Sequence, residues 1–186
     1  MAETVSAILR YLPLLLGLVA LPSIGLAHRL DEYLQATLVT IEPGEVRLQI
    51  NLTPGVAVAE KVLALVDRDR DDVVSSNEAT AYCELLKRDL IVRLDQHKLA
   101  LRLISSRFDS STELRTGWGI IQIEFSAIVG PMTKGAHRLA LKNRHFPASS
   151  VYLFNAAQPR FSSVQVTRQK RNEIQSAGEI DFTIDR

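Results

Sequence analysis

The sequence predicts a mainly β protein built as a two-sheet sandwich, with a helix-loop-helix inserted between its first and second pairs of strands. Three observations lead to this prediction. Short runs of alternating apolar and polar residues recur along the 186-residue chain, and turn-forming residues separate them. One interval, at about residues 55–90, instead repeats its apolar residues at the spacing of a helix. We therefore expect about nine short strands and one helical insertion.

The chain begins with a segment typical of a secretory signal, residues 1–27. Arg10 precedes an apolar run over residues 11–21, and small residues lead up to a cleavage position behind Ala27. We expect this signal helix to be removed and the remainder to be periplasmic or secreted. The alternative is an uncleaved membrane anchor, although two prolines interrupt the apolar run before it reaches the ~20 residues of a membrane span.

Composition indicates one domain over residues 28–186. That length suits a single hydrophobic core, and no repeat, low-complexity tract or linker divides it. The 22 basic and 21 acidic residues nearly balance, and no basic stripe interleaved with aromatic residues occurs, so nucleic acid is not an expected partner. Cys83 is the single cysteine, which excludes an internal disulfide, and its place on an apolar helix face predicts a packed side chain.

The first pair of strands is predicted on either side of the turn Glu42-Pro43-Gly44-Glu45. Pro followed by Gly at the centre is the signature of a type II turn. Apolar residues alternate with polar ones on both sides of it: Leu34, Ala36 and Leu38 before the turn, and Val46, Leu48, Ile50 and Leu52 after it. We expect the two apolar sets to share one face of a hairpin.

A second hairpin is predicted around Asp95-Gln96-His97-Lys98, with Leu90, Val92 and Leu94 before this turn and Leu99, Leu101 and Leu103 after it. Later alternating runs lie at residues 121–127, 139–141, 151–153, 164–166 and 180–184. Together these strands favour an immunoglobulin-like sandwich. The interval Ser105–Gly119 predicts the longest loop, and we expect Trp118 at its end to lie in the core.

Two helices are predicted between the strand pairs. The first covers residues 56–66, and the second has apolar residues at helical spacing at Ala79, Tyr82, Cys83, Leu86 and Leu90. Ser76 precedes the second pattern, so we expect its side chain to cap that helix.

The dodecamer between these helices, residues 67–78, has the ligand spacing of an EF-hand calcium loop. Oxygen donors fall at loop positions one, three, five, seven, nine and twelve, the seventh through its main-chain carbonyl: Asp67, Asp69, Asp71, Val73, Ser75 and Glu78. Ca²⁺ takes about six to eight oxygen ligands in irregular geometry, whereas Mg²⁺ demands a smaller octahedron. We therefore expect the loop to bind one Ca²⁺.

Two features of the loop depart from the EF-hand pattern. Asp72 occupies position six, where Gly is usual because the backbone adopts a positive φ, and Asp enters that region at a cost of about 1 kcal/mol. Arg68 and Arg70 reduce the negative potential of the loop, which weakens its attraction for a cation. The alternative interpretation is an acidic, solvated turn that binds no metal, but it leaves the spacing of Glu78 unexplained.

Cleavage behind Ala27 would make His28 the N-terminal residue and place a free amine beside an imidazole. Such a pair chelates Cu²⁺ or Ni²⁺, and His97, His137 or His145 would complete a nitrogen site. This observation favours an alternative function, a periplasmic module that binds or delivers copper or nickel. His145 itself lies in a turn sequence, where a surface or turn histidine is expected rather than a ligand.

Motifs of catalysis do not occur in the chain. It has no Gly-x-Ser-x-Gly, no His-Glu-x-x-His, no pair of cysteines and no glycine-rich phosphate loop. We therefore expect a protein that is not an enzyme, in which bound calcium stabilises the fold.

Four segments carry a resemblance to known proteins: HRLDEYLQ from His28, NLTPGVAV from Asn51, the acidic loop, and SVYLFN from Ser150. With them the chain resembles bacterial exported proteins described as EF-hand domain-containing, which implies calcium at the six donors of the loop. It is also similar to exported domains that precede membrane proteins of the hydrogenase and urease accessory type and of the nickel/cobalt exporter type. That similarity implies service to transition-metal traffic. We also expect a membrane protein or another envelope component as partner.

Overall fold

The computed structural model describes residues 31–185, which form two five-stranded sheets packed face to face. The first sheet has the order β5-β6-β2-β1-β8, with β1 Tyr33–Glu42, β2 Glu45–Pro54, β5 Arg102–Phe108, β6 Ile121–Ile128 and β8 Ser150–Ala156. The second has the order β4-β3-β7-β10-β9, with β3 Leu90–Leu94, β4 His97–Lys98, β7 Gly135–Asn143, β9 Val164–Arg171 and β10 Ala177–Ile184. The predicted mainly β sandwich is confirmed, and each of the five later alternating runs lies within a strand.

The hairpin of β1 and β2 is confirmed, but the face predicted for β1 is wrong. The strands are antiparallel, and Gly44 takes a φ of +91° in the turn. Leu34 and Leu38 pair with Thr53 and Gln49 on the outer face, where they are 38% and 37% exposed. The inner face of β1 instead carries a mixed set that includes two buried polar side chains: Tyr33, Gln35, Thr37, Val39 and Ile41. Alternation located the strand, but polar and apolar residues occur on both of its faces.

The second predicted hairpin forms only in part. The turn consists of Asp95 and Gln96, both with positive φ, and only His97–Lys98 returns beside β3. The chain then leaves the second sheet, and Arg102–Phe108 pairs with β6 in the first sheet. Leu99, Leu101 and Leu103 therefore do not form a strand against β3. They are half-buried and pack on the edge of the core.

β8 pairs in parallel with β1 and forms one edge of the first sheet, so that β1 lies between β2 and β8. The outer edge of β8 is covered by side chains from β9. The Gln169 amide accepts a hydrogen bond from Ala156 N and donates one to Phe154 O, which also accepts one from Arg171. These side chains satisfy backbone groups that an edge strand leaves unpaired.

The core fills the space between the sheets, and its largest fully buried side chains are Tyr33, Tyr82, Phe125, Phe154 and Phe182. Cys83 is completely buried, as predicted, and burial raises the pKa of its thiol. Trp118 is 69% exposed, so its prediction as a core residue is wrong. It follows the short helix α5 Ser111–Arg115 and stands between two buried glycines, Gly117 and Gly119.

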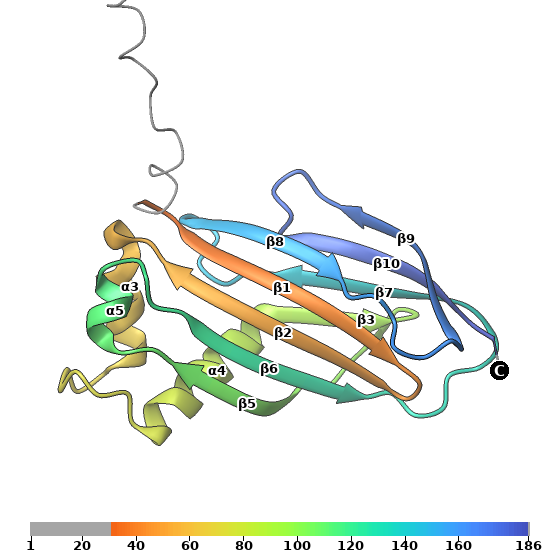
Figure 1. Ribbon diagram of the computed structural model, residues 1–186, viewed down its shortest axis with the longest axis horizontal. Helices are drawn as coiled ribbons and strands as arrows, with labels where there is room; N and C mark the ends of the chain where they lie inside the picture. Colours follow the sequence, from red (N-terminus) through yellow and green to blue (C-terminus); the bar gives the residue numbers. More distant parts are fainter. Residues whose placement is uncertain (1–30, 186) are drawn as a thin grey trace, which may run out of the picture.

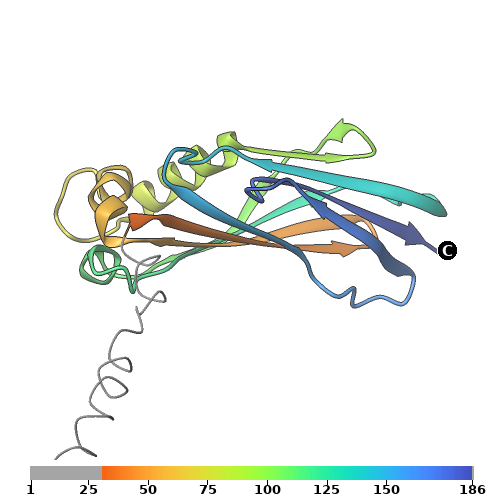
Figure 2. The ribbon, with the colours of Figure 1, turned by 90° about the horizontal axis from the view of Figure 1, so that it is seen from above.

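Three helices gather at one end of the sandwich (Figures 1 and 2). α3 Val56–Val66 and α4 Ser76–Asp89 confirm the predicted helix pair, although Ser75 rather than Ser76 is the N-cap. The predicted loop Ser105–Gly119 is wrong, because it contains the end of β5 and then α5. In α5, Ser110 and Glu113 form a capping box, which stabilises a single helical turn.

The expected signal helix, its cleavage behind Ala27 and His28 lie outside the described residues. Within residues 31–185 no helix is long and apolar enough to cross a membrane.

Candidate metal centre

The acidic loop joins the end of α3 to the start of α4. Asp67 is the C-cap residue of α3, and its amide donates to Leu63 O. Ser75 is the N-cap residue of α4, and its hydroxyl accepts from Glu78 N. The first and ninth positions of the predicted calcium loop are therefore fixed by the two helices that flank it.

The three aspartates converge. Asp67, Asp69 and Asp71 each place a carboxylate oxygen within 4.8 Å of the others. Asp67 is buried, with 3% of its surface exposed, and its carboxylate accepts hydrogen bonds from Asp71 N at 3.2 Å and from Asp72 N at 3.1 Å. These bonds wind the loop around the carboxylate of its first residue, so the three side chains project toward a common point.

Asp72 adopts the left-handed backbone that its place in the loop predicts, with a φ of +66°. Arg70, two residues earlier, has a φ of +63°. The helix α5 contacts this turn: Arg115 donates to the Asp72 carboxylate at 2.7 Å, and Ser111 donates to Asp72 O at 3.3 Å. Asp72, at the position where the EF-hand pattern has Gly, is thus held in place by a helix more than 35 positions later in the chain.

Glu78, the predicted twelfth ligand, links the two ends of the loop. One carboxylate oxygen accepts from the amides of Arg68 and Asp69, and the other accepts from the amide and hydroxyl of Ser75. The Ser75 hydroxyl, followed by the backbone amides of Ser75 and Arg68, lowers the pKa of Glu78 to about 2. Its carboxylate is therefore ionised and faces the loop, but it is not part of the cluster formed by the three aspartates.

Negative charges accumulate in the loop. Desolvation, and then the charges of Asp71 and Glu78, raise the pKa of Asp69. A cation among these carboxylates would relieve this repulsion.

The two remaining predicted donors lie on the same loop. Val73 is 64% exposed, and its amide donates to the Asp71 carboxylate at 2.8 Å. Ser75 uses its hydroxyl in the capping box with Glu78. Five of the six predicted residues thus lie between α3 and α4, and Glu78 lies in the first turn of α4. Three of them, the aspartates, converge as side chains.

The histidines of the alternative copper or nickel site are engaged elsewhere. His137 contacts Asp95 and Thr133 O through its two ring nitrogens, at 2.6 and 2.7 Å. His145 contacts Asp89 and Tyr82 in the same way, at 2.7 and 3.0 Å. His97 is exposed, and its Nδ1 lies 3.1 Å from Asp95 O. None of the three belongs to a metal-binding cluster within residues 31–185, and His28, which one of them would join, lies outside that range.

Of the two alternatives predicted for His145, a surface or a turn histidine, the structure shows the turn, because only 1% of the residue is exposed. It lies in the turn between β7 and β8, where its buried ring joins a chain of hydrogen bonds that continues from Tyr82 to Tyr33. Burial lowers the pKa of His145 more than Asp89 raises it, so the ring is neutral. This chain connects α4, which carries Glu78, with β1 in the sandwich.

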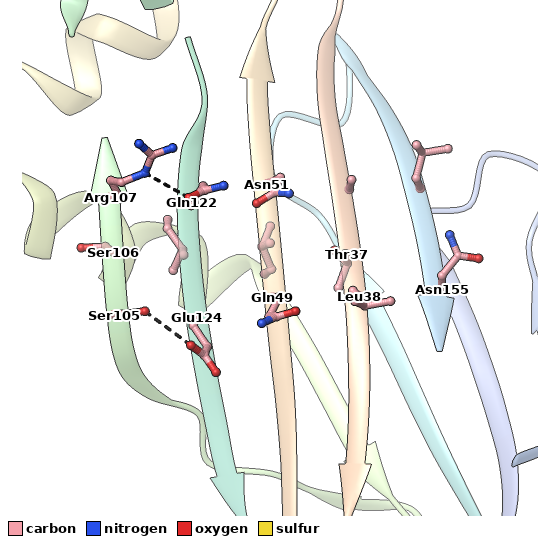
Figure 3. A pocket seen from close by; sticks show the side chains of 14 residues that line it. Thr37, Leu38, Gln49, Asn51, Ser105, Ser106, Arg107, Gln122, Glu124 and Asn155 are labelled. Carbon is pink, nitrogen blue, oxygen red and sulfur yellow. Dashed lines mark hydrogen bonds between the residues drawn. The ribbon is translucent and has the colours of Figure 1, made fainter. Parts of the chain in front are cut away.

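A groove of about 430 Å³ on the outer face of the first sheet is a second concave region (Figure 3). Amide side chains line it, with Gln49 and Asn51 on β2 and Gln122 on β6, where Gln122 accepts from Arg107 at 3.0 Å. Leu38 and Asn155 border its other side. The groove has none of the predicted donors, so it is separate from the acidic loop.

No protein-family model matches the chain, and no curated protein sequence matches it. The assignment of the acidic loop therefore depends on its own geometry and chemistry.

Proposed function

We propose that this protein is an exported, non-enzymatic domain whose acidic loop binds one Ca²⁺ and thereby stabilises the fold. The observation that carries the proposal is the convergence of the Asp67, Asp69 and Asp71 carboxylates within 4.8 Å, in a loop whose sixth residue has a left-handed backbone. Together with a glutamate at position twelve, these two features match the EF-hand ligand pattern.

The donor set fits calcium chemistry. Three aspartates, the Val73 carbonyl, Ser75 or a water that it holds, and a bidentate Glu78 supply about seven oxygens, which suits Ca²⁺ better than Mg²⁺. Glu78 would join the ion by exchanging its bonds to the Arg68 and Ser75 amides for metal ligation. Desolvation is the largest cause of the raised pKa of Asp69, and repulsion by Asp71 and Glu78 adds to it; a bound cation would offset this repulsion, which supports the proposal.

The effect of binding would be greatest on the helical end of the protein. The loop connects α3 with α4 and contacts α5 through Arg115 and Ser111, so one ion would tie three helices together. Calcium at a hundred times its dissociation constant would raise the free energy of unfolding by about 2.7 kcal/mol. Outside the cytoplasm, affinities of about 10⁻⁴ to 10⁻³ M suffice for such modules.

Export and the resemblance to EF-hand domain-containing proteins remain parts of this proposal. So does a membrane protein or envelope component as partner. The copper or nickel module built on His28 stays a prediction, and no described residue adds support to it.

Melting curves recorded with Ca²⁺, with Mg²⁺ and with EDTA test the proposal. With a dissociation constant of about 10⁻⁴ M, we expect about 10 mM Ca²⁺ to raise the melting temperature by about 5–10 °C over EDTA, and Mg²⁺ to raise it less. Glu78→Gln should abolish the rise. Glu84→Gln removes a carboxylate from the exposed surface of the same helix, and this variant should show the same calcium-dependent rise in melting temperature as the unmodified protein. Equal melting temperatures of the unmodified protein in Ca²⁺ and in EDTA would contradict the proposal.

A further inference from the structure

Positive charge gathers on the outer face of the second sheet. A shallow hollow of about 540 Å³ on β3, β7, β9 and β10 is lined by five basic residues and one acidic residue: Arg93, Lys142, Arg144, Lys170, Arg171 and Glu179. The whole chain, by contrast, has only one more basic than acidic residue. We call this region the basic hollow.

Strand register explains how the hollow arises. Arg93 pairs with Ala140, Ala140 pairs with Glu179, and Glu179 pairs with Lys170, so these residues form one row across four strands. Paired residues share a face of the sheet. Lys142 lies in the next row, opposite Ala177. The two alanines keep the floor of the hollow low, and the long basic side chains rise around it.

The charges of the hollow are largely uncompensated. Arg93, Lys142, Arg144 and Lys170 make no side-chain hydrogen bond or ion pair with any residue in the described range 31–185. Glu179 lies 3.8 Å from the guanidinium of Arg138, outside the hollow. Arginines elsewhere on this face are paired, since Asp181 binds both Arg138 and Arg168. Four free cations on one face attract anions.

We propose that the basic hollow docks this face onto a membrane surface that contains anionic lipids. The helices gather at one end of the sandwich (Figure 2), and no helix residue lines the hollow. The free cations come from three strands and from the chain just after β7, so they spread in two dimensions and do not converge on one buried anion. A planar array of lipid phosphates complements such a face.

Other anionic partners fit the hollow less well. A small anion would need donors directed at one point, and the four free cations instead lie around a floor of alanines. A linear polyanion would need a continuous line of cations, but Ala140 and Glu179 interrupt the row between Arg93 and Lys170. The proposal is independent of the calcium loop, since none of its donors lines the hollow.

Sedimentation with lipid vesicles in EDTA tests the proposal, because chelation removes any calcium bridge between protein and lipid. We expect the protein to sediment with vesicles that contain phosphatidylglycerol and not with vesicles of phosphatidylcholine alone. About 0.5 M salt should release it, because ions screen these charges. Glu78→Gln should bind like the unmodified protein, so a failure of the calcium proposal would leave this result unchanged.

Charge reversal identifies the face. Lys142→Glu combined with Lys170→Glu should lower the vesicle partition coefficient by about thirtyfold or more, since each basic residue near a membrane contributes a factor of about five. Lys61→Glu combined with Arg160→Glu changes the net charge equally outside the hollow and should have a much smaller effect. Melting temperatures near that of the unmodified protein would verify that both variants fold.

Three results would overturn the proposal. The first is equal binding of the two double variants, which would show that only net charge matters. The second is equal binding to neutral and anionic vesicles. The third is binding to soluble polyphosphate with none to anionic vesicles, which would identify a polyanionic chain as the partner of the hollow.

Discussion

Arg115 donates to the carboxylate of Asp72 at 2.7 Å, although 43 positions separate the two residues. The same guanidinium bonds Glu60 on α3 at 3.0 Å. It therefore joins α5 to both the acidic loop and the helix that precedes the loop. Asp72 stands where a calcium loop usually has Gly, and its side chain gains a partner that Gly could not have. The contact also places a positive charge at the rim of the proposed metal site.

Arg115→Gln should raise calcium affinity by about two- to fivefold, because it removes a cation that repels Ca²⁺ across a solvent-exposed distance. The same change should lower the melting temperature in EDTA slightly, since an exposed ion pair contributes about 0–1 kcal/mol. Isothermal titration with Ca²⁺ measures the first effect. Arg107→Gln, on the exposed strand β5, is the matched control. An affinity that stays constant or falls in Arg115→Gln would contradict this role.

The buried chain of Tyr33, Tyr82, His145 and Asp89 has a defined direction. Because the His145 ring is neutral, its Nδ1–H donates to Asp89 and its Nε2 accepts from the Tyr82 hydroxyl. The Tyr33 hydroxyl, 2.5 Å from that of Tyr82, then donates to Tyr82. Every polar atom of the chain is satisfied only when all four residues are present.

Tyr82→Phe should destabilise the protein by about 1–3 kcal/mol, because it leaves His145 Nε2 and the Tyr33 hydroxyl buried without partners. Tyr33→Phe should cost less, since Tyr82 keeps its own acceptor. The double variant should cost less than the sum of the two single changes, because Tyr33 has no function in the chain once Tyr82 is lost. Urea unfolding gives these free energies, and strict additivity would contradict the proposed direction.

His137 predicts a pH dependence of stability. The Asp95 carboxylate, and then the Thr133 carbonyl, raise the pKa of His137 above its usual value of 6.5. Both ring nitrogens face acceptors, so the protonated ring is the form that fits. The stabilisation by protonated His137 is complete below about pH 6.5, the pKa of histidine in the unfolded chain. It is lost as the pH rises through the higher pKa that His137 has in the folded protein.

Unfolding free energies at about pH 6 and about pH 9 measure this contribution. His137→Gln should lose more stability at the lower pH than at the higher one. His145 does not interfere with the comparison, because both proteins retain it. An equal loss at the two pH values would mean that protonation of His137 adds nothing to the fold.

Gly178→Ala should be strongly destabilising. A Cβ at this position would overlap the ring of Phe154, which is 1% exposed, and would approach Lys170 O to 2.9 Å. The ring cannot move without disturbing the packed core, so we expect a loss of about 1–3 kcal/mol. Chemical denaturation measures it, and Ala177→Gly at the neighbouring half-exposed position is a control that should be milder. A Gly178→Ala protein as stable as the parent would contradict this packing.

Features that depend on neighbouring residues were predictable. Pro43 and Gly44 locate the first hairpin. The six predicted donors lie within twelve consecutive residues, so they stay neighbours in the fold, five of them between α3 and α4 and Glu78 in the first turn of α4. The turn at Asp95 and Gln96 was predicted, but the long second strand expected after it was not found. Asp95 and Gln96 make a two-residue turn, and the long strand that follows, β5, belongs to the other sheet. That exchange of sheets depends on tertiary packing, which no local pattern records.

Features assembled from distant residues were missed. Arg115 and Ser111 reach the acidic loop only through folding, yet the spacing of Ser110 and Glu113 is a capping-box signal that could have indicated a helix there. The basic hollow draws its charges from separate strands, so it leaves no basic run in the sequence. The turn at His145 is evident in its local sequence, but its burial is not, because its partners Tyr82 and Asp89 lie more than 50 positions earlier in the chain.

The parallel pairing of β1 with β8 means that the first sheet cannot finish folding until late in the synthesis of the chain. Gln35 on β1 bonds Ser150, 115 positions later, so one side of β1 has no partner until most of the chain has emerged. Such distant pairings form slowly, and an uncovered strand edge recruits other chains. A nascent or truncated polypeptide that ends before Ser150 would therefore be prone to aggregation, and a chaperone that shields this edge would protect it.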